Sequence, residues 1–376
     1  MNERRKILFY THALAGGGAE RVWTLLASGF ARQGHDVIMA VDYEADDNLA
    51  FLDPGVRLVV LGGAHAHNVM RLAQLIAREK PDVTLSALCV SNMKHVLAAA
   101  IAGRRDRAIL SYHGFFASEP QPMSRLSYLL TPLLTRLSAR TIAVSDLLRD
   151  YLKAQFRSHP WRTQRIYNPV VWGDGAPVLR EADLKARAPL VVACGRLVRD
   201  KNFDSLIRAF ARVKREDARL VIIGEGPERA ALEAEISRLN LRERVSLAGY
   251  LREPWKVYAQ ASCLAVSSQL ESFGMVVVEA LGHGLPVVAT DCQGPREILA
   301  DGRIGRLVPI GDEAAMAGAI TAALDEPGNP APRMARASDF SIARALAAYD
   351  QTIDDVCRES ATEPARTEKL ASLEAQ

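Results

Sequence analysis

The sequence lacks the long apolar runs of a membrane-spanning or exported protein. No window of its 376 residues approaches the run of about 18 apolar residues that spans a bilayer. The basic residues near the start precede a short apolar run that Gly16, Gly17 and Gly18 interrupt. A signal peptide needs a longer apolar stretch and a small-residue cleavage site. We therefore expect a cytoplasmic protein.

Cysteine is scarce, and several catalytic motifs are missing. The five cysteines are scattered and show no Cys-x-x-Cys spacing, so we expect free thiols and no metal site. The chain contains no P-loop, and its first glycine-rich stretch, GGGAER, lacks the spacing of a dinucleotide-binding loop. These absences argue against a nicotinamide-dependent dehydrogenase. We also expect no bound cofactor and no nucleic-acid partner.

What the sequence does contain is an alternation of strands and helices that runs through the chain twice. Hydrophobic residues make up 49% of the chain and charged residues 24%, enough for two buried cores. The pattern predicts an α/β protein of two Rossmann-like domains facing across a cleft. We expect a first domain at 1–170, a linker at 171–188, a second domain at 189–340, a final helix at 341–357 packing back on the first domain, and a disordered polar tail at 358–376.

The strongest local feature is the segment ESFGMVVVE, which places Glu271 and Glu279 around the start of a helix expected at 273–281. Ser272 is the expected cap, and the free amide groups of the first turn, with the helix dipole, make an anion site. Gly274 lets the backbone approach a ligand closely. Glu279 lies in an apolar stretch and needs a partner, for which ribose hydroxyls or a nearby arginine would serve.

A basic loop at 195–202, GRLVRDKN, joins the first strand of the second domain to its helix. Arg196 and Lys201 flank this loop, and Asn202 is the expected N-cap. A cation beside a helix N-terminus is unfavourable unless an anion binds there. The loop therefore favours a clamp that stabilises a diphosphate leaving group without a metal. A solvated basic loop is the alternative.

These residues carry a resemblance to a known family. The segments GRLVRDKNFDSLIRAF, LVIIGEGPER, LAGY, ESFGMVVVEALGHGLPVVATD and GPREIL, at about 190–320, resemble the C-terminal domain of family 4 retaining glycosyltransferases of the GT-B architecture. In the N-terminal half GGGAERV, His113, AVSDLLRDYL and IYNPV are similar in weaker ways. The GPREIL and GGGAER elements together are most similar to those of bacterial enzymes that build lipid-linked or surface glycans. Ser267-Ser268 departs from the Pro-Ser of many relatives, which bears on the stiffness of that loop.

The resemblance implies that the first domain binds the acceptor and the second the nucleotide sugar, and it implies a role for each matching position. Arg196 and Lys201 would hold the donor diphosphate, Glu271 would bind donor-sugar hydroxyls beside the reacting carbon, and His113 would touch the donor sugar. Glu279 would bind the ribose. The other donor-binding positions that the resemblance implies are Gly16, Gly17, Gly18, Gly224, Tyr250, Leu251, Ser272, Phe273, Gly274, Met275 and Val276.

The implied reaction moves an N-acetylhexosamine or hexose from a nucleotide-diphosphate sugar, a UDP-sugar in several relatives, to a glycan or a polyprenyl-diphosphate-linked acceptor. Configuration is retained, because the acceptor hydroxyl enters on the face from which the nucleoside diphosphate leaves. No metal takes part. Two alternatives stay open. One is a GT-B-fold sugar-nucleotide epimerase, which would consume the donor without an acceptor, and the other is a non-catalytic nucleotide-sugar-binding protein.

Charge is unevenly distributed along the chain. Between Lys94 and Arg165 there are 12 Lys and Arg against 4 Asp and Glu. Within this region Arg125–Arg140, RLSYLLTPLLTRLSAR, spaces leucines almost helically, with Pro132 to kink or divide the segment. A basic amphipathic segment can lie in the interface of an anionic membrane. We therefore expect the first domain to dock on the inner face of the cell membrane. The alternative is that the leucines pack on the sheet while the arginines face water.

Overall fold

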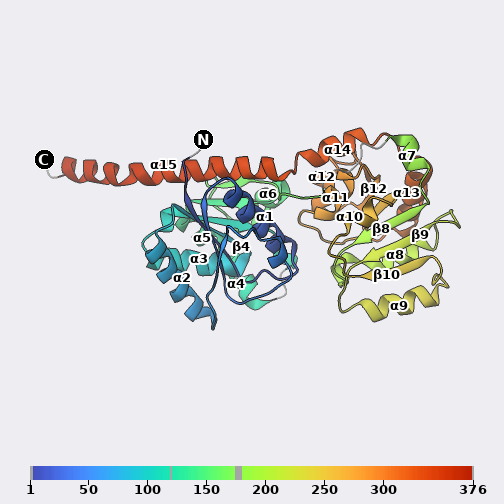
Figure 1. Ribbon diagram of the computed structural model, residues 1–376, viewed down its shortest axis with the longest axis horizontal. Helices are drawn as coiled ribbons and strands as arrows, with labels where there is room; N and C mark the ends of the chain where they lie inside the picture. The colour runs from blue at the N-terminus through green and yellow to red at the C-terminus, as the bar shows by residue number, and fades with distance from the viewer. Residues whose placement is uncertain (1–2, 119–120, 174–179, 375–376) are drawn as a thin grey trace. The chain divides into compact units, whose positions relative to one another are not determined.

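The computed structural model describes residues 3–118, 121–173 and 180–374. It divides into two compact units, one formed by Met1–Pro169 with Ile342–Gln376 and the other by Val170–Ser341. Each unit is built on its own parallel sheet with helices on both faces (Figure 1).

The first unit has a seven-stranded sheet in the order β3-β2-β1-β4-β5-β6-β7. The strands are β1 (Lys6–Thr11), β2 (Asp36–Val41), β3 (Arg57–Val60), β4 (Val83–Ala87), β5 (Ala108–Tyr112), β6 (Arg140–Ala143) and β7 (Thr163–Arg165). Neighbouring strands pair in parallel throughout. The strand order reverses direction between β1 and β4, which is the switch point of a doubly wound sheet. Ligands of such sheets bind outside the carboxyl ends of the strands at that point.

Helices cover both faces of this sheet. They are α1 (Gly18–Arg32), α2 (His65–Glu79), α3 (Cys89–Ile101), α4 (Pro122–Leu129), α5 (Thr131–Leu137), α6 (Asp146–Phe156) and α15 (Ile342–Glu374), with short 3-10 turns at Leu49–Phe51, Arg105–Arg107 and Phe116–Ser118. Leu8 and Tyr10 of β1 share a buried core with residues of α2 and α3. On the other face Phe9 packs edge-on against Trp23 of α1, with ring centroids 5.7 Å apart. Trp23 in turn meets Tyr349 of α15.

The last helix is longer than its sequence predicts. α15 continues to Glu374, so the prediction of a disordered tail is wrong for residues 358–374, while 375–376 lie outside the described residues. The tail is polar, but Glu, Ala, Arg, Lys and Leu dominate it, and these residues have high intrinsic helix propensity. Arg5, which precedes β1, contacts α15 through an ion pair with Asp354 at 2.6 Å.

The second unit repeats the same topology with six strands, in the order β10-β9-β8-β11-β12-β13. The strands are β8 (Leu190–Cys194), β9 (Arg219–Ile223), β10 (Val245–Gly249), β11 (Cys263–Val266), β12 (Val287–Thr290) and β13 (Arg306–Val308). The helices are α7 (Glu181–Lys185), α8 (Phe203–Phe210), α9 (Arg229–Arg238), α10 (Trp255–Tyr258), α11 (Met275–Gly282), α12 (Gln293–Ile298), α13 (Glu313–Asp325) and α14 (Ala331–Ser338), with a 3-10 turn at Arg199–Lys201. Apolar residues of α8, α9 and α13 form one core with the strands. The switch point here lies between β8 and β11.

The expected linker begins inside the second unit. Trp172 packs so closely on α11 that a Cβ added to Gly282 would lie 2.4 Å from its ring. The second unit accordingly begins at Val170 rather than at residue 189, while the first unit's main segment ends at Pro169, one residue from the expected 170. Part of the predicted linker, 174–179, lies outside the described residues.

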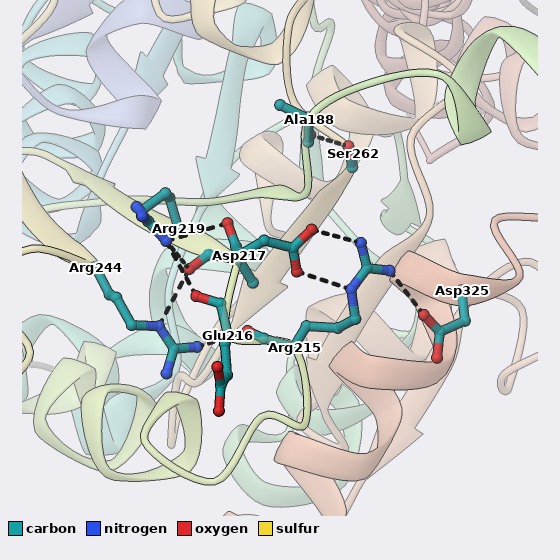
Figure 2. A network of polar contacts seen from close by, with 9 residues as sticks. Ala188, Arg215, Glu216, Asp217, Arg219, Arg244, Ser262 and Asp325 are labelled. Carbon is teal, nitrogen blue, oxygen red and sulfur yellow. Dashed lines mark hydrogen bonds and ion pairs between the residues drawn. The ribbon is translucent and has the colours of Figure 1, made fainter.

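Polar contacts connect neighbouring segments at the amino edge of the second sheet (Figure 2). Arg215 forms ion pairs at 2.9 Å with both Asp217 and Asp325. Arg244 donates to the carbonyl of Arg215 at 2.8 Å, and Ser262 donates to that of Ala188 at 2.7 Å. The charge of Arg215 is thus paired within the fold, so the network is structural.

Candidate active site

The strand order brings Lys201 and Glu271 to one place. β8 and β11 are direct neighbours, with Val191 opposite Cys263, so the loops that follow them meet at the switch point. The loops are fastened to each other. The amide of Gln269 donates to the Asp200 carbonyl, and the Ser267 hydroxyl donates to the Lys201 carbonyl, both at 2.8 Å.

The two side chains form an ion pair in which Lys201 Nζ donates to Glu271 Oε2. Both side chains are largely buried, with 24% of Lys201 and 17% of Glu271 exposed. Burial lowers the pKa of Lys201, but the charge of Glu271 and its hydrogen bond outweigh this and raise the pKa above its usual value. Lys201 therefore carries its charge at neutral pH. Arg196, in the same loop, is exposed and forms no ion pair within the part of the chain that the structure describes.

Glycines let the strand ends of this site approach each other closely. Gly224, directly after β9, has a φ of 143°, and its amide donates to the Gly249 carbonyl at 2.8 Å. A Cβ at Gly224 would lie 1.9 Å from the Gly195 carbonyl oxygen. Only glycine fits at this position. Tyr250, 57% exposed, follows β10 at the same carboxyl edge, and Leu251 comes next.

The helix behind Glu271 begins later than predicted. α11 starts at Met275 with Gly274 as its N-cap, in a left-handed conformation with a φ of 96°, and no side chain caps it. The prediction that Ser272 is the cap is therefore wrong. The turn at Gly274 replaces it, because glycine adopts positive φ without strain. The amides of Met275 and Val276 lie in the first turn and have no acceptor within the helix. Phe273 is buried against Phe340.

Glu279 faces a buried tyrosine and a cysteine. Tyr258 of α10 is fully buried, and burial, together with the charges of Cys194 and Glu279, raises its pKa well above the usual value. Tyr258 therefore stays protonated and presents a hydroxyl to this pair. Cys194 ends β8, and burial raises its pKa to about 12. Neither Tyr258 nor Cys194 was predicted from the sequence, because a tyrosine and a cysteine in apolar segments are typical of core positions.

The remaining predicted residues lie in the first unit. α1 begins at Gly18 with Gly17 as its N-cap, and Gly16 lies beside the Asp47 carboxylate. His113 follows β5, with Nε2 3.0 Å from the Ser111 hydroxyl and its ring edge-on to Trp23. Burial lowers the pKa of His113 to about 3. Its imidazole is therefore neutral at physiological pH.

One polar cluster of the first unit was missed from the sequence. His12, directly after β1, is hydrogen-bonded to Asp42, directly after β2, and Asp42 also pairs with the buried Lys94 of α3. The sequence did contain a sign of this cluster, since both His12 and Asp42 directly follow apolar strands at the carboxyl edge of a parallel sheet. Lys94 was counted only as part of the basic region.

Across residues 3–118, 121–173 and 180–374 the structure holds no group of three His, Cys, Asp or Glu arranged to hold a metal ion. No described helix is long and apolar enough to cross a membrane.

Comparison with known proteins places both halves of the chain. The profile of Glycosyl transferases group 1 matches residues 179–339, and that of Glycosyltransferase Family 4 matches residues 16–171. Over 324 residues the chain is 36% identical to the lipopolysaccharide core biosynthesis glycosyltransferase LpsE of Rhizobium meliloti, covering 81% of this chain and 84% of LpsE. The chain belongs to this glycosyltransferase family.

Other relatives of this glycosyltransferase match it over shorter stretches. It is 36% identical over 167 residues to the N-acetylgalactosamine-N,N'-diacetylbacillosaminyl-diphospho-undecaprenol 4-alpha-N-acetylgalactosaminyltransferase of Campylobacter jejuni, which is 44% of this chain and 45% of that enzyme. The aligned stretch therefore spans less than half the length of that relative. Among solved structures, Anabaena HepE in complex with UDP superposes with a TM-score of 0.81 and 21% identity, covering 93% of this chain and all of HepE. This likeness confirms the predicted fold class of two Rossmann-like domains.

Proposed function

We propose that this chain is a retaining, metal-independent glycosyltransferase that moves a hexose or N-acetylhexosamine from a UDP-sugar to a lipid-linked or surface glycan. One observation carries the proposal. The ion pair of Lys201 with Glu271 lies at the switch point of the second sheet, beside the exposed Arg196 and the first turn of α11. A paired cation and carboxylate at such a point suit a ligand that has a phosphate end and a hydroxyl-rich end.

Donor binding would exchange the partners within this pair. Lys201 would leave Glu271 for a phosphate oxygen of the donor, and the freed carboxylate would accept hydrogen bonds from the sugar hydroxyls. Arg196 would supply the second cation to the diphosphate. The amides of Met275 and Val276, at the positive end of α11, would donate to the same phosphates. In this proposal Glu279, next to Tyr258, binds the ribose, and the neutral His113 contacts the donor sugar.

The reaction would break the bond between the anomeric carbon and the phosphate oxygen. The acceptor oxygen forms its bond to that carbon on the same face, and its proton passes to the departing phosphate oxygen. Negative charge builds up on that phosphate oxygen as its bond to carbon breaks and before the proton arrives, and Lys201 and Arg196 would stabilise that charge. Because two cations already do this, we propose that no metal ion is required.

The relatives support the substrate class. LpsE takes part in lipopolysaccharide core biosynthesis, and the Campylobacter relative is named for transfer to a diphospho-undecaprenol-linked sugar. We propose an acceptor of the same kind here, a glycan carried on a polyprenyl diphosphate. HepE was solved with UDP and with UDP-glucose, which supports a UDP-sugar donor.

We also propose that the first unit meets the membrane that holds such an acceptor. Pro132 divides the predicted amphipathic segment into α4 and α5. Large apolar side chains of these helices and of the adjacent α3 stay at the surface and form what we call the apolar face: Leu97, Ile101, Met123, Leu126, Leu129 and Leu133, between 39% and 63% exposed. An exposed apolar patch on a soluble domain indicates an interaction site. The alternative was that the leucines are buried against the sheet. Leu134 is buried, as this alternative requires, but the residues of the apolar face are not.

Of the arginines in the predicted amphipathic segment, Arg125 and Arg136 are exposed, as predicted, and Arg140 is not. Arg140 is only 14% exposed and pairs with Glu359, so it belongs to the fold rather than to a lipid-binding surface. Arg105 and Arg136 are exposed, and with Arg162 they line a pocket at the end of the apolar face. The Arg162 guanidinium donates to the carbonyl groups of Arg136 and Ser138. Apolar side chains flanked by arginines suit the interface of an anionic bilayer.

A transfer assay tests the proposed activity. The protein is incubated with a panel of UDP-sugars and a short-chain prenyl-diphosphate-linked disaccharide, and the products are measured by mass spectrometry. One added sugar mass on the disaccharide is expected with one donor. Conversion of the donor to its epimer without an acceptor would instead favour the epimerase. Tight UDP-sugar binding without any product would favour a non-catalytic binding protein.

A further inference from the structure

A buried ion pair lies under the carboxyl edge of the first sheet. Asp42 follows β2 and is 2% exposed, and the side chain of Lys94, 3% exposed, reaches it from α3 with Nζ 2.5 Å from Oδ2. The hydroxyl of Tyr10 donates to the other carboxylate oxygen at 2.8 Å. Burying a charge carries a high desolvation cost unless the charge is paired and hydrogen-bonded. The carboxylate of Asp42 is both.

His12 is the exposed end of this buried group. Its Nδ1 lies 2.7 Å from Asp42 Oδ2, and 46% of its side chain is exposed. The backbone holds it in place, because the Asp42 amide donates to the His12 carbonyl at 2.9 Å. Burial raises the pKa of Asp42, but hydrogen bonds from His12, Lys94 and Tyr10 outweigh it and hold the pKa below its usual value. Asp42 is therefore a carboxylate and accepts hydrogen from Nδ1.

This arrangement leaves the second ring nitrogen of His12 for a ligand. Lys94 already balances the charge of Asp42, so the pair does not depend on a charged imidazole. When the ring is neutral with its hydrogen on Nδ1, Nε2 is a hydrogen-bond acceptor. No residue in the described part of the chain donates to Nε2.

Two further aromatic rings lie beside the His12 ring. Tyr43, 47% exposed, packs edge-on against His12 with centroids 4.8 Å apart. The ring of His65, at the start of α2, lies 6.4 Å from His12 and is also exposed. Exposed aromatic rings offer apolar area on rigid side chains, and the carbon-bound hydrogens of a pyranose pack on such rings while its hydroxyls need polar partners. An acceptor nitrogen among aromatic rings therefore matches a sugar.

We propose that His12, Tyr43 and His65 form the acceptor-sugar subsite of the first unit, with His12 Nε2 accepting a hydrogen bond from a hydroxyl of the acceptor glycan. Asp42 and Lys94 are positioning residues that fix the ring and its tautomer. The proposal rests on the proposed glycosyltransferase activity and deepens it, because it assigns the acceptor to specific residues outside the donor site.

Kinetics with the prenyl-diphosphate-linked disaccharide test the subsite. His12→Ala and Tyr43→Ala should each raise the KM for this acceptor at least about tenfold. The KM for the UDP-sugar, and its slow hydrolysis without acceptor, should stay within about twofold of wild type. His67→Ala is the matched control and should leave every constant unchanged. His67 is an exposed histidine in the same turn of α2 as His65. An unchanged acceptor KM in His12→Ala would overturn the proposal.

A binding measurement on the unmodified protein makes the test independent of turnover and of folding of the variants. Nitrogen-15 NMR of histidine-labelled protein should show His12 with hydrogen on Nδ1 and a bare Nε2. Adding the disaccharide probe should shift the Nε2 resonance, whereas adding UDP alone should not. If no sugar is transferred by the wild-type protein but Nε2 still responds to the probe, the proposed reaction fails and the subsite stands. An Nε2 resonance that does not shift at a saturating probe concentration would contradict the subsite itself.

Discussion

Lys201 and Glu271 are 70 residues apart in the chain, and their side chains form an ion pair at the junction of β8 and β11. The sequence predicted opposite tasks for them, with the lysine on the diphosphate and the glutamate on the sugar. Their contact gives these proposed tasks a physical connection, because each side chain holds the other in place in the absence of a donor. The ion pair thus keeps both charges satisfied in a largely buried site before the substrate enters.

We predict that Lys201→Ala and Glu271→Gln each lower kcat/KM at least about 100-fold, which is roughly 3 kcal/mol of transition-state stabilisation. The reason is the loss of the cation that meets the leaving diphosphate or of the carboxylate that orients the sugar. Steady-state kinetics with the UDP-sugar found in the transfer assay measure the effect. Arg215→Ala, in the structural network of Figure 2, is the control and should lower the melting temperature without a comparable loss of kcat. Near-wild-type turnover in either site variant would contradict the assignment.

Activity should survive removal of divalent metal ions. Lys201 and the exposed Arg196 provide two positive charges where a metal ion would otherwise neutralise the diphosphate. The transfer rate is measured after dialysis against EDTA and again after Mg²⁺ or Mn²⁺ is added back. A rate within about twofold of the untreated enzyme is expected. Loss of activity in EDTA that Mn²⁺ restores would show that the two cations are not sufficient.

The residues of the proposed donor site could be picked out from the sequence because short local patterns contain them. A strand, a basic loop and a helix follow one another between residues 190 and 210, and the parallel order of the strands then fixes where Lys201 lies. The contact of Lys201 with Glu271 was not predictable from the local patterns. It depends on β11 pairing with β8 rather than with β10, which is a long-range choice.

Other elements escaped prediction for physical reasons. β3 is a strand at the sheet edge with two exposed end residues and two half-buried middle residues, so its apolar signal is weak. Ser272 has the chemistry of an N-cap, but the backbone turn at Gly274 took that position. The buried contact of Lys94 with Asp42 joins residues 52 apart, and a lysine in a basic region gives no local sign that it is buried.

The product should keep the anomeric configuration of the donor, so that an α-linked UDP-sugar gives an α-glycoside. The proposed mechanism requires this, because the acceptor hydroxyl enters on the face that the diphosphate leaves. Proton NMR of the first product formed, through the coupling constant of its anomeric proton, measures the configuration. A β-linkage from an α-linked donor would mean attack from the opposite face, and the front-face mechanism would then be wrong.

The last prediction is that the first unit binds anionic membranes through its apolar face. Leu126, Leu129 and Leu133 should insert among the lipid chains, while Arg136 and neighbouring arginines meet the headgroups, at about 1 kcal/mol for each cation near an anionic surface. Co-sedimentation with liposomes should therefore rise with the fraction of anionic lipid and fall at high salt.

Two variants separate the apolar from the electrostatic part of this binding. Leu129→Gln with Leu133→Gln should lower the bound fraction at every salt concentration, because both side chains are more than half exposed and the fold does not need them. Arg105→Glu with Arg136→Glu should lower it chiefly on anionic liposomes at low salt. Ile310→Gln, at an exposed isoleucine of the second unit, is the matched control and should bind like the wild type. Equal binding to neutral and anionic liposomes would refute the electrostatic part. Unchanged binding of the double leucine variant would mean that the apolar face serves another partner.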